Sequence, residues 1–389
     1  MLGRGLLLFS LWSNYACVNE ELDREDKVTP FVRVRFTALP ENVIAPPDNL
    51  PTAEKIELGR LLFYDPILSG DRDVACASCH HPSSGYAETL ELSIGVNGQG
   101  FGSRRAFKTP NAIPFTKRNA QSVLNTAFNG VDIFGDYDPQ EAPMFWDLRV
   151  QSLENQVLEP IKAMEEMRGL NYSEEEIYPE IISRIKAIPE YRKYFERVFP
   201  DTEPITMENI SRAIAAFERT LVANNSRFDL YMRGDKSALS ESEIEGFEIF
   251  KRVGCANCHN GPMFSDFKTH VISVPPTEKL NEPDSGFQSS FAFRTPTLRN
   301  LRFTFPFMHN GKLTSLKEIL EFYEDIAGGK TRNSHVLKSQ LDPFIQELKL
   351  EVKDMGPIIN FLLALNDEDF DKEIPESVPS GLPVGGSIR

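Results

Sequence analysis

Cysteine and long apolar runs are both scarce in this 389-residue chain. Only five cysteines occur, and four of them lie in two short motifs, so Cys17 has no partner left for a structural disulfide. No stretch of about 18 consecutive apolar residues is present, so the sequence predicts no membrane-spanning helix. We therefore expect a chain without disulfide staples that is soluble or merely tethered.

Basic residues are too few to balance the acidic ones. Lysine and arginine total 42 against 57 aspartates and glutamates, which gives a formal net charge of −15. Nucleic acid and anionic membrane surfaces would repel such a chain at long range, so neither is expected as a partner. A basic or neutral redox protein fits this charge better, and solubility alone is the alternative explanation.

Four of the cysteines form two copies of one motif, Cys76-Ala77-Ser78-Cys79-His80 and Cys255-Ala256-Asn257-Cys258-His259. C-x-x-C-H is the attachment signature of a c-type haem: both thiols form thioethers to the porphyrin, and the imidazole becomes an axial iron ligand. A C-x-x-C pair alone also suits tetrahedral zinc, but two copies that each end in histidine favour haem. The sequence thus predicts two covalently bound haems, with His80 and His259 as iron ligands.

The N-terminal segment has the features of an export signal. Residues 1–16 combine one arginine, a short apolar run and a small residue before Cys17. Cys17 resembles the lipid-modified cysteine of bacterial lipoproteins, with simple secretion as the alternative, and residues 17–45 are interpreted as a tether. Because c-type haem is attached outside the bacterial cytoplasm, we expect a periplasmic protein, tethered to the membrane if Cys17 is lipidated.

Each motif is preceded by a similar helix pattern. A helix is predicted from Pro51 with Thr52 as its cap, and its segment from Gly59 onward leads to the first motif. The segment from Gly246 onward leads to the second motif in the same way, after a capping signal at Ser240. This internal repeat predicts two related, mostly helical haem domains.

The expected fold is therefore mainly α, with two cytochrome c-like haem domains, long ordered loops and little sheet. The N-terminal domain is placed at residues 46–233, the C-terminal domain at residues 234–370, and a tail that frays at residues 371–389. Residues 207–231 predict one long helix before the domain junction, and residues 358–365 a closing helix. Residues 93–114 predict an ordered loop that forms a wall of a cofactor site.

Beyond the haem motifs, the order of residues resembles the bacterial di-haem cytochrome c peroxidase family, which includes MauG. The segments that carry the resemblance are Leu58-Gly59-Arg60, Leu62-Phe63, Asp65, Leu68-Ser69, the first haem motif, Pro82, Phe145-Trp146-Asp147, Gln156, Glu166-Met167, residues 293–300, Pro306, His309-Asn310-Gly311 and Phe322-Tyr323. They extend over about residues 50–366 and are highly specific.

In this family the first haem is the peroxide site, the second haem stores electrons, and a tryptophan lies between them. The resemblance implies that Trp146 is this tryptophan and that Gln156 and Glu166 form the distal pair beside the first haem. A carboxylate in a semi-buried pocket, its pKa raised by desolvation, suits the proton transfer that peroxide cleavage needs. Taken alone, the three residues would more often be a core aromatic, a solvated glutamine and a surface carboxylate.

The axial ligands opposite the two histidines decide which iron can bind peroxide. Many family members place a displaceable histidine in the loop that corresponds to residues 103–118, and this sequence has none there. His81 is expected to be a surface residue, so the first haem is predicted to be open. For the second haem, the family position of the sixth ligand is Tyr323, as in MauG, and the alternative ligand is Met308.

Family members also hold a calcium ion between the haems. The resemblance implies Asn119 and the carbonyl groups of Thr304 and Pro306 as its ligands, with Asn125 as the alternative asparagine. Oxygen ligands of this kind suit a hard cation.

Two arginines, Arg294 and Arg299, are expected to pair with the haem propionates. A guanidinium can match a carboxylate with two parallel hydrogen bonds. Two of the six histidines, His270 and His335, have no predicted role.

Together, these features predict an exported di-haem cytochrome c peroxidase. The first haem, in the N-terminal domain, would reduce hydrogen peroxide to water, and the second would transfer electrons from a small cytochrome c or copper protein. One alternative is MauG-like oxidation of a protein side chain through a high-valent di-haem state, and another is a non-catalytic electron-transfer cytochrome. A homodimer is a further expectation.

Overall fold

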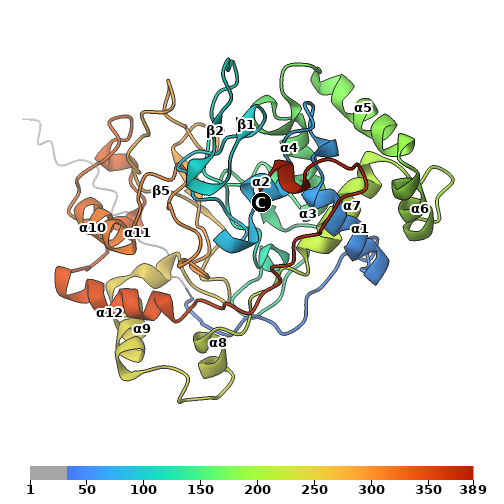
Figure 1. The fold of residues 1–389 in the computed structure, drawn as a ribbon. Coiled ribbons are helices and arrows are strands. Elements are labelled where there is room, and N and C mark those ends of the chain that lie inside the picture. The colour runs from blue at the N-terminus through green and yellow to red at the C-terminus, as the bar shows by residue number, and fades with distance from the viewer. Residues whose placement is uncertain (1–32, 389) are drawn as a thin grey trace, which may run out of the picture. The chain divides into compact units, whose positions relative to one another are not determined.

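The computed structural model describes residues 33–388, which belong to one unit. The predicted export signal at residues 1–16, Cys17 and the first part of the predicted tether lie outside the described residues. Figure 1 shows helices joined by long loops, with little sheet. The prediction of a mainly α fold is confirmed. Within residues 33–388, no helix is long and apolar enough to cross a membrane.

Residues 33–388 contain twelve α-helices, several of them only one turn long. They are α1 (Ala53–Tyr64), α2 (Cys76–Cys79), α3 (Leu153–Gln156), α4 (Leu158–Lys162), α5 (Glu174–Ala187), α6 (Pro189–Val198), α7 (Met207–Glu218), α8 (Arg227–Met232), α9 (Glu241–Val253), α10 (Leu316–Ala327), α11 (Pro343–Gln346) and α12 (Val352–Leu363). A π-helical turn, Met164–Arg168, follows α4.

Short antiparallel strand pairs shape the loops instead of forming a continuous sheet. They are β1 (Gly98–Gln99) with β2 (Ala106–Phe107), β3 (Pro143–Met144) with β4 (Val150–Gln151), and β5 (Thr269–Val271) with β6 (Ala292–Arg294). In the longest pair, His270 lies opposite Phe293. The last two pairs contribute residues to the functional site.

The helices that precede the haem motifs start where the sequence predicts. Thr52 caps α1 by accepting a hydrogen bond from the Lys55 amide, and Ser240 and Glu243 form a capping box at the start of α9. These caps satisfy backbone amides that have no partner within the first helical turn. Both predicted start signals are confirmed.

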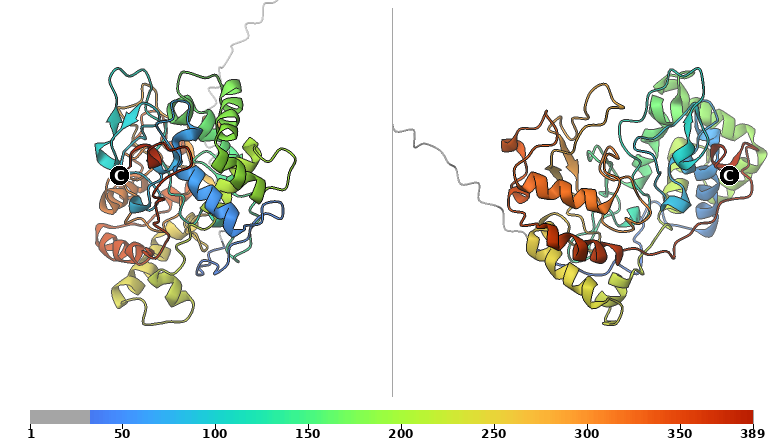
Figure 2. Two further views of the ribbon diagram at one scale, coloured as in Figure 1. Left: turned by 45° about the vertical axis from the view of Figure 1, so that its right-hand side comes forward. Right: turned by 60° about the vertical axis from the view of Figure 1, so that its left-hand side comes forward.

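The internal repeat corresponds to a close helix crossing in each half. Gly59 of α1 lies against the Ala213 carbonyl of α7, and Gly246 of α9 lies against the Pro357 carbonyl of α12. A Cβ atom at either glycine would collide with that carbonyl. Figures 1 and 2 both show α9 and α12 side by side. The glycines therefore recur because two helix backbones must approach closely at this point.

Two main hydrophobic cores pack against the haem motifs, one against each motif. The larger is built mainly from residues 58–223 and contains Phe63 and Phe217, whose ring centroids lie 5.3 Å apart. The second is built from residues 228–365 and contains Phe247 and Phe361, which stack at 4.9 Å. The proposed domain boundaries, 46–233 and 234–370, stay a prediction.

The single long helix predicted for residues 207–231 is wrong. α7 ends at Glu218 and α8 begins only at Arg227. Between them, the Asn125 side chain accepts from the Ala223 amide at 2.7 Å and donates to the Ala223 carbonyl at 3.0 Å. Ser226 then caps α8. The apolar periodicity continues across the break, so it gives no sign of the tertiary hydrogen bonds that replace the helical ones.

The prediction that the C-terminal tail frays is also wrong. Residues 371–388, dark red in Figure 1, run from α12 back to the first haem motif. The Ser380 hydroxyl donates to the buried Asp65 carboxylate at 2.6 Å, and the Ser78 hydroxyl donates to the Gly385 carbonyl at 2.8 Å. Ile388 is buried in the N-terminal core. Proline and glycine in this segment exclude a long helix, but side-chain contacts hold it in place.

A buried ion pair joins α8 to the loop that follows β6. Both terminal nitrogens of Arg299 donate to the Asp229 carboxylate, at 2.8 and 2.9 Å, and the two side chains are 1% and 0% exposed. The same carboxylate accepts a hydrogen bond from the Leu39 amide at 2.9 Å. Removing one member of such a pair leaves the other charge buried without a partner.

We therefore expect Asp229→Ala to lower the free energy of unfolding by about 3–5 kcal/mol. Urea unfolding followed by circular dichroism measures this loss. Arg302→Ala is the control, because the Arg302–Glu368 ion pair is exposed and is expected to contribute less than about 1 kcal/mol. Equal losses in the two variants would contradict a special role for the buried pair.

Candidate functional site

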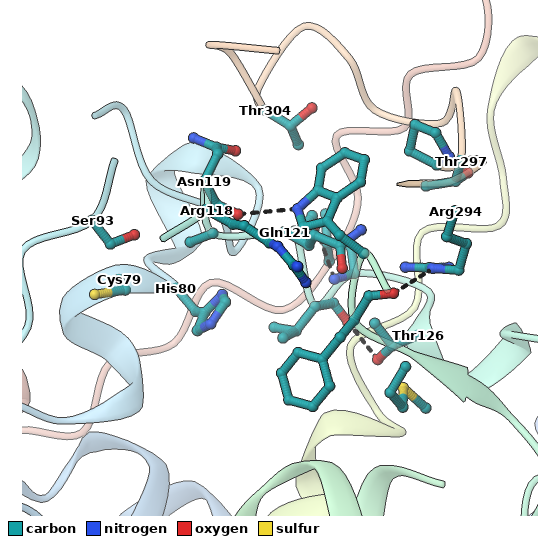
Figure 3. Close-up of a pocket in the computed structure, with 18 of the residues that line it drawn as sticks. Cys79, His80, Ser93, Arg118, Asn119, Gln121, Thr126, Arg294, Thr297 and Thr304 are labelled. Carbon is teal, nitrogen blue, oxygen red and sulfur yellow. Dashed lines mark hydrogen bonds between the residues drawn. The ribbon is translucent and has the colours of Figure 1, made fainter. Parts of the chain in front are cut away.

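Both haem motifs contribute to the wall of one cavity of about 560 Å³. Cys76, Cys79 and His80 line it from the first motif, and His259 lines it from the second. Loops at residues 116–126, 144–149 and 294–308 supply much of the remaining wall. Figure 3 shows Cys79 and His80 on one side of this cavity and Arg294 on the other. The two sequence motifs thus belong to one site.

Each motif folds as a tight turn that fixes its histidine. His80 follows α2, and its Nδ1 atom lies 3.1 Å from the Tyr86 carbonyl. The Nδ1 atom of His259 lies 2.9 Å from the Phe264 carbonyl. Burial lowers the pKa of both imidazoles, which favours their neutral form. A neutral imidazole that donates from Nδ1 keeps the Nε2 lone pair free for a metal.

The cysteines have the arrangement that covalent haem attachment requires. Cys76, Cys79, Cys255 and Cys258 are all half-buried, and none forms a disulfide. With one neutral imidazole after each pair and a shared cavity, these groups fit two c-type haems. Structural zinc would need a fourth ligand at each turn, beyond the two thiols and the imidazole. The individual attachment roles stay a prediction.

Among the described residues, His80 and His259 are the two of the six histidines that line the cavity. The expectation that His81 is a surface residue is wrong. Its ring packs 4.2 Å from the Phe101 ring, and its Nδ1 atom lies 2.7 Å from the Ser83 hydroxyl. The loop that carries Phe101 folds over His81 and keeps it buried.

Trp146 lines the cavity from the loop between β3 and β4 and is 8% exposed. Its Nε1 atom donates to the Asn119 carbonyl at 3.2 Å, and its own carbonyl accepts from the Arg294 amide at 2.7 Å. The His309 ring meets the indole edge-on, with centroids 6.4 Å apart. Segments from both halves of the chain therefore hold this indole. Its role as a bridge between haems stays a prediction.

The predicted distal pair lines the same cavity. Gln156 is the last residue of α3, and Glu166 lies on the π-helical turn. The Val96 amide donates to the Glu166 carbonyl at 3.0 Å and so fixes this turn. Burial, and then the neighbouring Glu165 carboxylate, raise the pKa of Glu166 to about 7. A carboxyl with this pKa exchanges its proton near neutral pH, unlike an ordinary surface carboxylate.

Both candidates for the sixth ligand of the second haem line the cavity. Tyr323 projects from α10, and burial raises the pKa of its hydroxyl. No hydrogen bond to this hydroxyl is found in residues 33–388, so its oxygen is available to a metal. Met308 reaches the cavity from a left-handed backbone position with φ of 73°. Tyr323 stays the predicted ligand, with Met308 as the alternative.

The two arginines predicted to bind propionates differ in whether a protein carboxylate already pairs with the guanidinium. Arg294 lines the cavity with a 6% exposed side chain, and its Nε atom donates to the Phe145 carbonyl at 3.0 Å. No carboxylate pairs with it among the described residues, and burial lowers its pKa to about 10. A buried cation without a counter-ion fits a propionate. Arg299 also lines the cavity, but Asp229 already neutralises its charge.

The predicted calcium ligands line the cavity as well. The Asn119 side chain donates to the Leu90 carbonyl at 2.9 Å, which leaves its amide oxygen free. In the described part of the chain, no hydrogen bond reaches the carbonyls of Thr304 and Pro306. These free oxygens fit a hard cation. Asn125, the alternative, uses both side-chain groups on Ala223 and is not free to bind one.

Sequence reasoning missed one carboxyl in the cavity wall. Glu218 ends α7 and is 3% exposed, and its Oε2 atom has no hydrogen-bond partner among the described residues. Burial raises its pKa to about 8. The helical period places Glu218 on the same face as Ile214, four residues earlier, so the pattern could have predicted its burial.

Sequence reasoning also missed the role of Arg118. This guanidinium pairs with Asp147 at 2.8 Å and contacts both carboxylate oxygens of Asp284. The two acids lie far from Arg118 in sequence, in different halves of the chain, so no local pattern indicates the cluster. It fixes the loop directly before Asn119.

Known proteins are similar in sequence to most of this chain. Residues 53–237 match the family model described as di-haem cytochrome c peroxidase. The chain is 34% identical over 350 residues to the methylamine utilization protein MauG of Methylorubrum extorquens, an alignment that covers 89% of this chain and 87% of that protein. It is 34% identical over 281 residues to cytochrome c551 peroxidase of Nitrosomonas europaea, covering 69% and 72%.

One solved structure extends the likeness to the fold. The crystal structure of a MauG-like protein associated with microbial copper homeostasis matches with a TM-score of 0.67 and 26% identity, covering 85% of this chain and 95% of that one. Since the alignment with MauG covers most of both sequences, the predicted resemblance is confirmed. The chain belongs to the di-haem cytochrome c peroxidase and MauG family.

Proposed function

We propose that this protein reduces hydrogen peroxide to two molecules of water, using two electrons and two protons. The first haem is the proposed peroxide site, and the second is the proposed electron-transfer site. A haem attached to Cys76 and Cys79, with His80 as an iron ligand, would supply the iron, and the two electrons would come from the donor protein through the second haem. Glu166 is the observation that carries this proposal, because it is a proton-exchanging carboxyl in the wall of that haem's cavity.

Peroxide cleavage needs a group that takes a proton from one oxygen and returns it to the other, which leaves as water. Glu166 can do both near neutral pH, because its raised pKa leaves both protonation states populated. Gln156 lines the same cavity, and its amide can both donate and accept hydrogen bonds to orient the peroxide. Arg294 offers a positive charge for a propionate on the opposite side.

The remaining assignments belong to the same proposal. The acidic chain, with net charge −15, suits a basic or neutral electron donor such as a small cytochrome c or copper protein. Asn119, Thr304 and Pro306 would hold a calcium ion. The proposal also includes export to the periplasm, a lipid anchor at Cys17 and a homodimer.

A second candidate function is oxidation of a protein side chain, as the resemblance to MauG implies. Tyr323 favours it, because its hydroxyl would lose its proton on binding iron, and the resulting phenolate would stabilise the more oxidised states of the metal. The lack of any histidine other than His80 and His259 in the described cavity wall points the same way. Both features concern the cofactor site, so peroxide reduction with a donor protein remains our leading proposal.

Replacing Glu166 by glutamine is expected to lower peroxide turnover about 10²–10⁴-fold while both haems stay attached. In the wild type, kcat/KM should fall as the pH drops below about 7, because only the ionised carboxyl accepts a proton. Steady-state assays across pH measure both effects. Glu165→Gln is the control: it removes a neighbouring negative charge, so the acid limb should move to lower pH while the maximal rate is kept. Near-normal turnover in Glu166→Gln would disprove the assignment.

Replacing Trp146 by phenylalanine is expected to leave peroxide binding intact and to slow electron delivery to the first haem. The shorter ring loses the hydrogen bond to the Asn119 carbonyl and part of the contact between the two halves. Stopped-flow spectroscopy with a reduced second haem separates the two steps. Phe293→Leu, a substitution in the same aromatic cluster, is the control. Unchanged electron-delivery rates in Trp146→Phe would show that another route is used.

Peroxide is expected to react with the fully ferric protein before any electron is added. The physical reason is that no histidine other than His80 and His259 lines the described cavity. Rapid mixing with peroxide, monitored in the haem absorption bands, tests this. A reaction that starts only after one-electron reduction would point to a displaceable ligand, and Lys117, which lines the same cavity, would be the first residue to replace.

A further inference from the structure

One histidine without a role in the proposed reaction sits between two carboxylates. The Nδ1 atom of His270 lies 2.7 Å from Asp342, and its Nε2 atom lies 3.0 Å from Asp266. The three side chains are 10%, 19% and 12% exposed, respectively. We call these residues the Asp266–His270–Asp342 triad. Such an arrangement removes three charged groups from water, so it is unusual for a purely structural contact.

Two segments build the triad: one carries Asp266 and His270, four residues apart, and the other carries Asp342. His270 is the middle residue of β5, and its backbone is held by pairing with Phe293 of β6. Asp342 precedes α11 and is fixed by a hydrogen bond from its amide to the Val271 carbonyl at 3.0 Å. Asp266 is fixed by a hydrogen bond from its amide to the Cys258 carbonyl at 2.9 Å. The side chains therefore meet in a preformed geometry.

The geometry decides the charge of the triad. Each imidazole nitrogen faces a carboxylate, and an ionised carboxylate can only accept hydrogen bonds, so both nitrogens must carry a proton. Burial alone would lower the pKa of His270, but the bonds to Asp266 and Asp342 raise it above its ordinary value. One imidazolium and two carboxylates give the triad a net charge of −1 at neutral pH.

The triad lies next to the second haem motif. The Cys258 sulfur, a carboxylate oxygen of Asp266 and a ring nitrogen of His270 all lie within 4.8 Å of one another. This sulfur is the atom that would form a thioether to the second haem, so it is not available to a metal ion. Both His270 nitrogens are used by the carboxylates as well. The cluster is therefore a charge group beside the Cys258 sulfur and not a metal site.

We infer that the Asp266–His270–Asp342 triad sets the reduction potential of the second haem. A net negative charge beside the Cys258 sulfur, where the second haem would attach, would favour ferric over ferrous iron through Coulomb interaction in a partly buried environment. The triad would thus help to hold the second haem oxidised. This inference deepens the proposed function, in which that haem transfers electrons, but it depends only on the haem being bound at Cys258.

The test is a spectroelectrochemical titration of the purified di-haem protein without peroxide. Asp342→Asn removes one negative charge, so the second haem should become easier to reduce by at least about tenfold in the ferric/ferrous ratio, equal to ~59 mV. His270→Gln, measured at pH 9 where both carboxylates are ionised, should shift the potential in the opposite direction. The first haem should keep its potential and serves as the internal reference.

Asp354→Asn is the matched control, because Asp354 is also a buried carboxylate paired with a cation, Arg252 at 3.0 Å, but is not part of the triad. It should leave both potentials unchanged. Shifts of opposite sign in Asp342→Asn and His270→Gln support the inference. An unchanged second-haem potential in Asp342→Asn, or shifts of the same sign in both variants, would overturn it. Since no peroxide is used, failure here is distinct from failure of the proposed peroxidase function.

Discussion

The hydrogen bond from each cavity-lining imidazole to a backbone carbonyl is the constraint on which the site depends. His80 is held by Tyr86 at 3.1 Å and His259 by Phe264 at 2.9 Å, so both rings are fixed before any cofactor arrives. Each haem motif follows a helix that packs closely against a second helix at a glycine, Gly59 in the first half and Gly246 in the second. The two cores are therefore scaffolds that place two equivalent ligands on one cavity.

The two sides of the cavity carry different polar side chains and are therefore suited to different reactions. Around the first motif, the π-helical turn presents Glu166, whose buried carboxyl can exchange a proton at neutral pH. Around the second motif, Tyr323 offers an unpaired oxygen and the Asp266–His270–Asp342 triad adds a negative charge. In the proposed function, protons would be transferred on the side of Glu166, and oxidised iron would be stabilised on the side of Tyr323 and the triad. This asymmetry fits one peroxide site and one electron-transfer site.

Much of this could be predicted from sequence, because local signals are strong where covalent chemistry or helix caps are involved. The haem motifs, the cap at Thr52, the capping box at Ser240 and the mainly α fold with little sheet all follow from short patterns. The distal pair and Trp146 could be identified only through the family resemblance. Alone, each has a commoner interpretation as an ordinary helix or core residue.

The remaining features depend on contacts between distant segments, which no local pattern reports. The break after α7 follows from hydrogen bonds of Asn125, about a hundred residues earlier, and the order of the C-terminal segment follows from contacts such as Ser380 with Asp65.

The central claim, an open first haem beside a ligated second haem, is tested most directly by electron paramagnetic resonance of the resting ferric protein. The account predicts one high-spin haem alongside one low-spin haem. Two low-spin haems would contradict it.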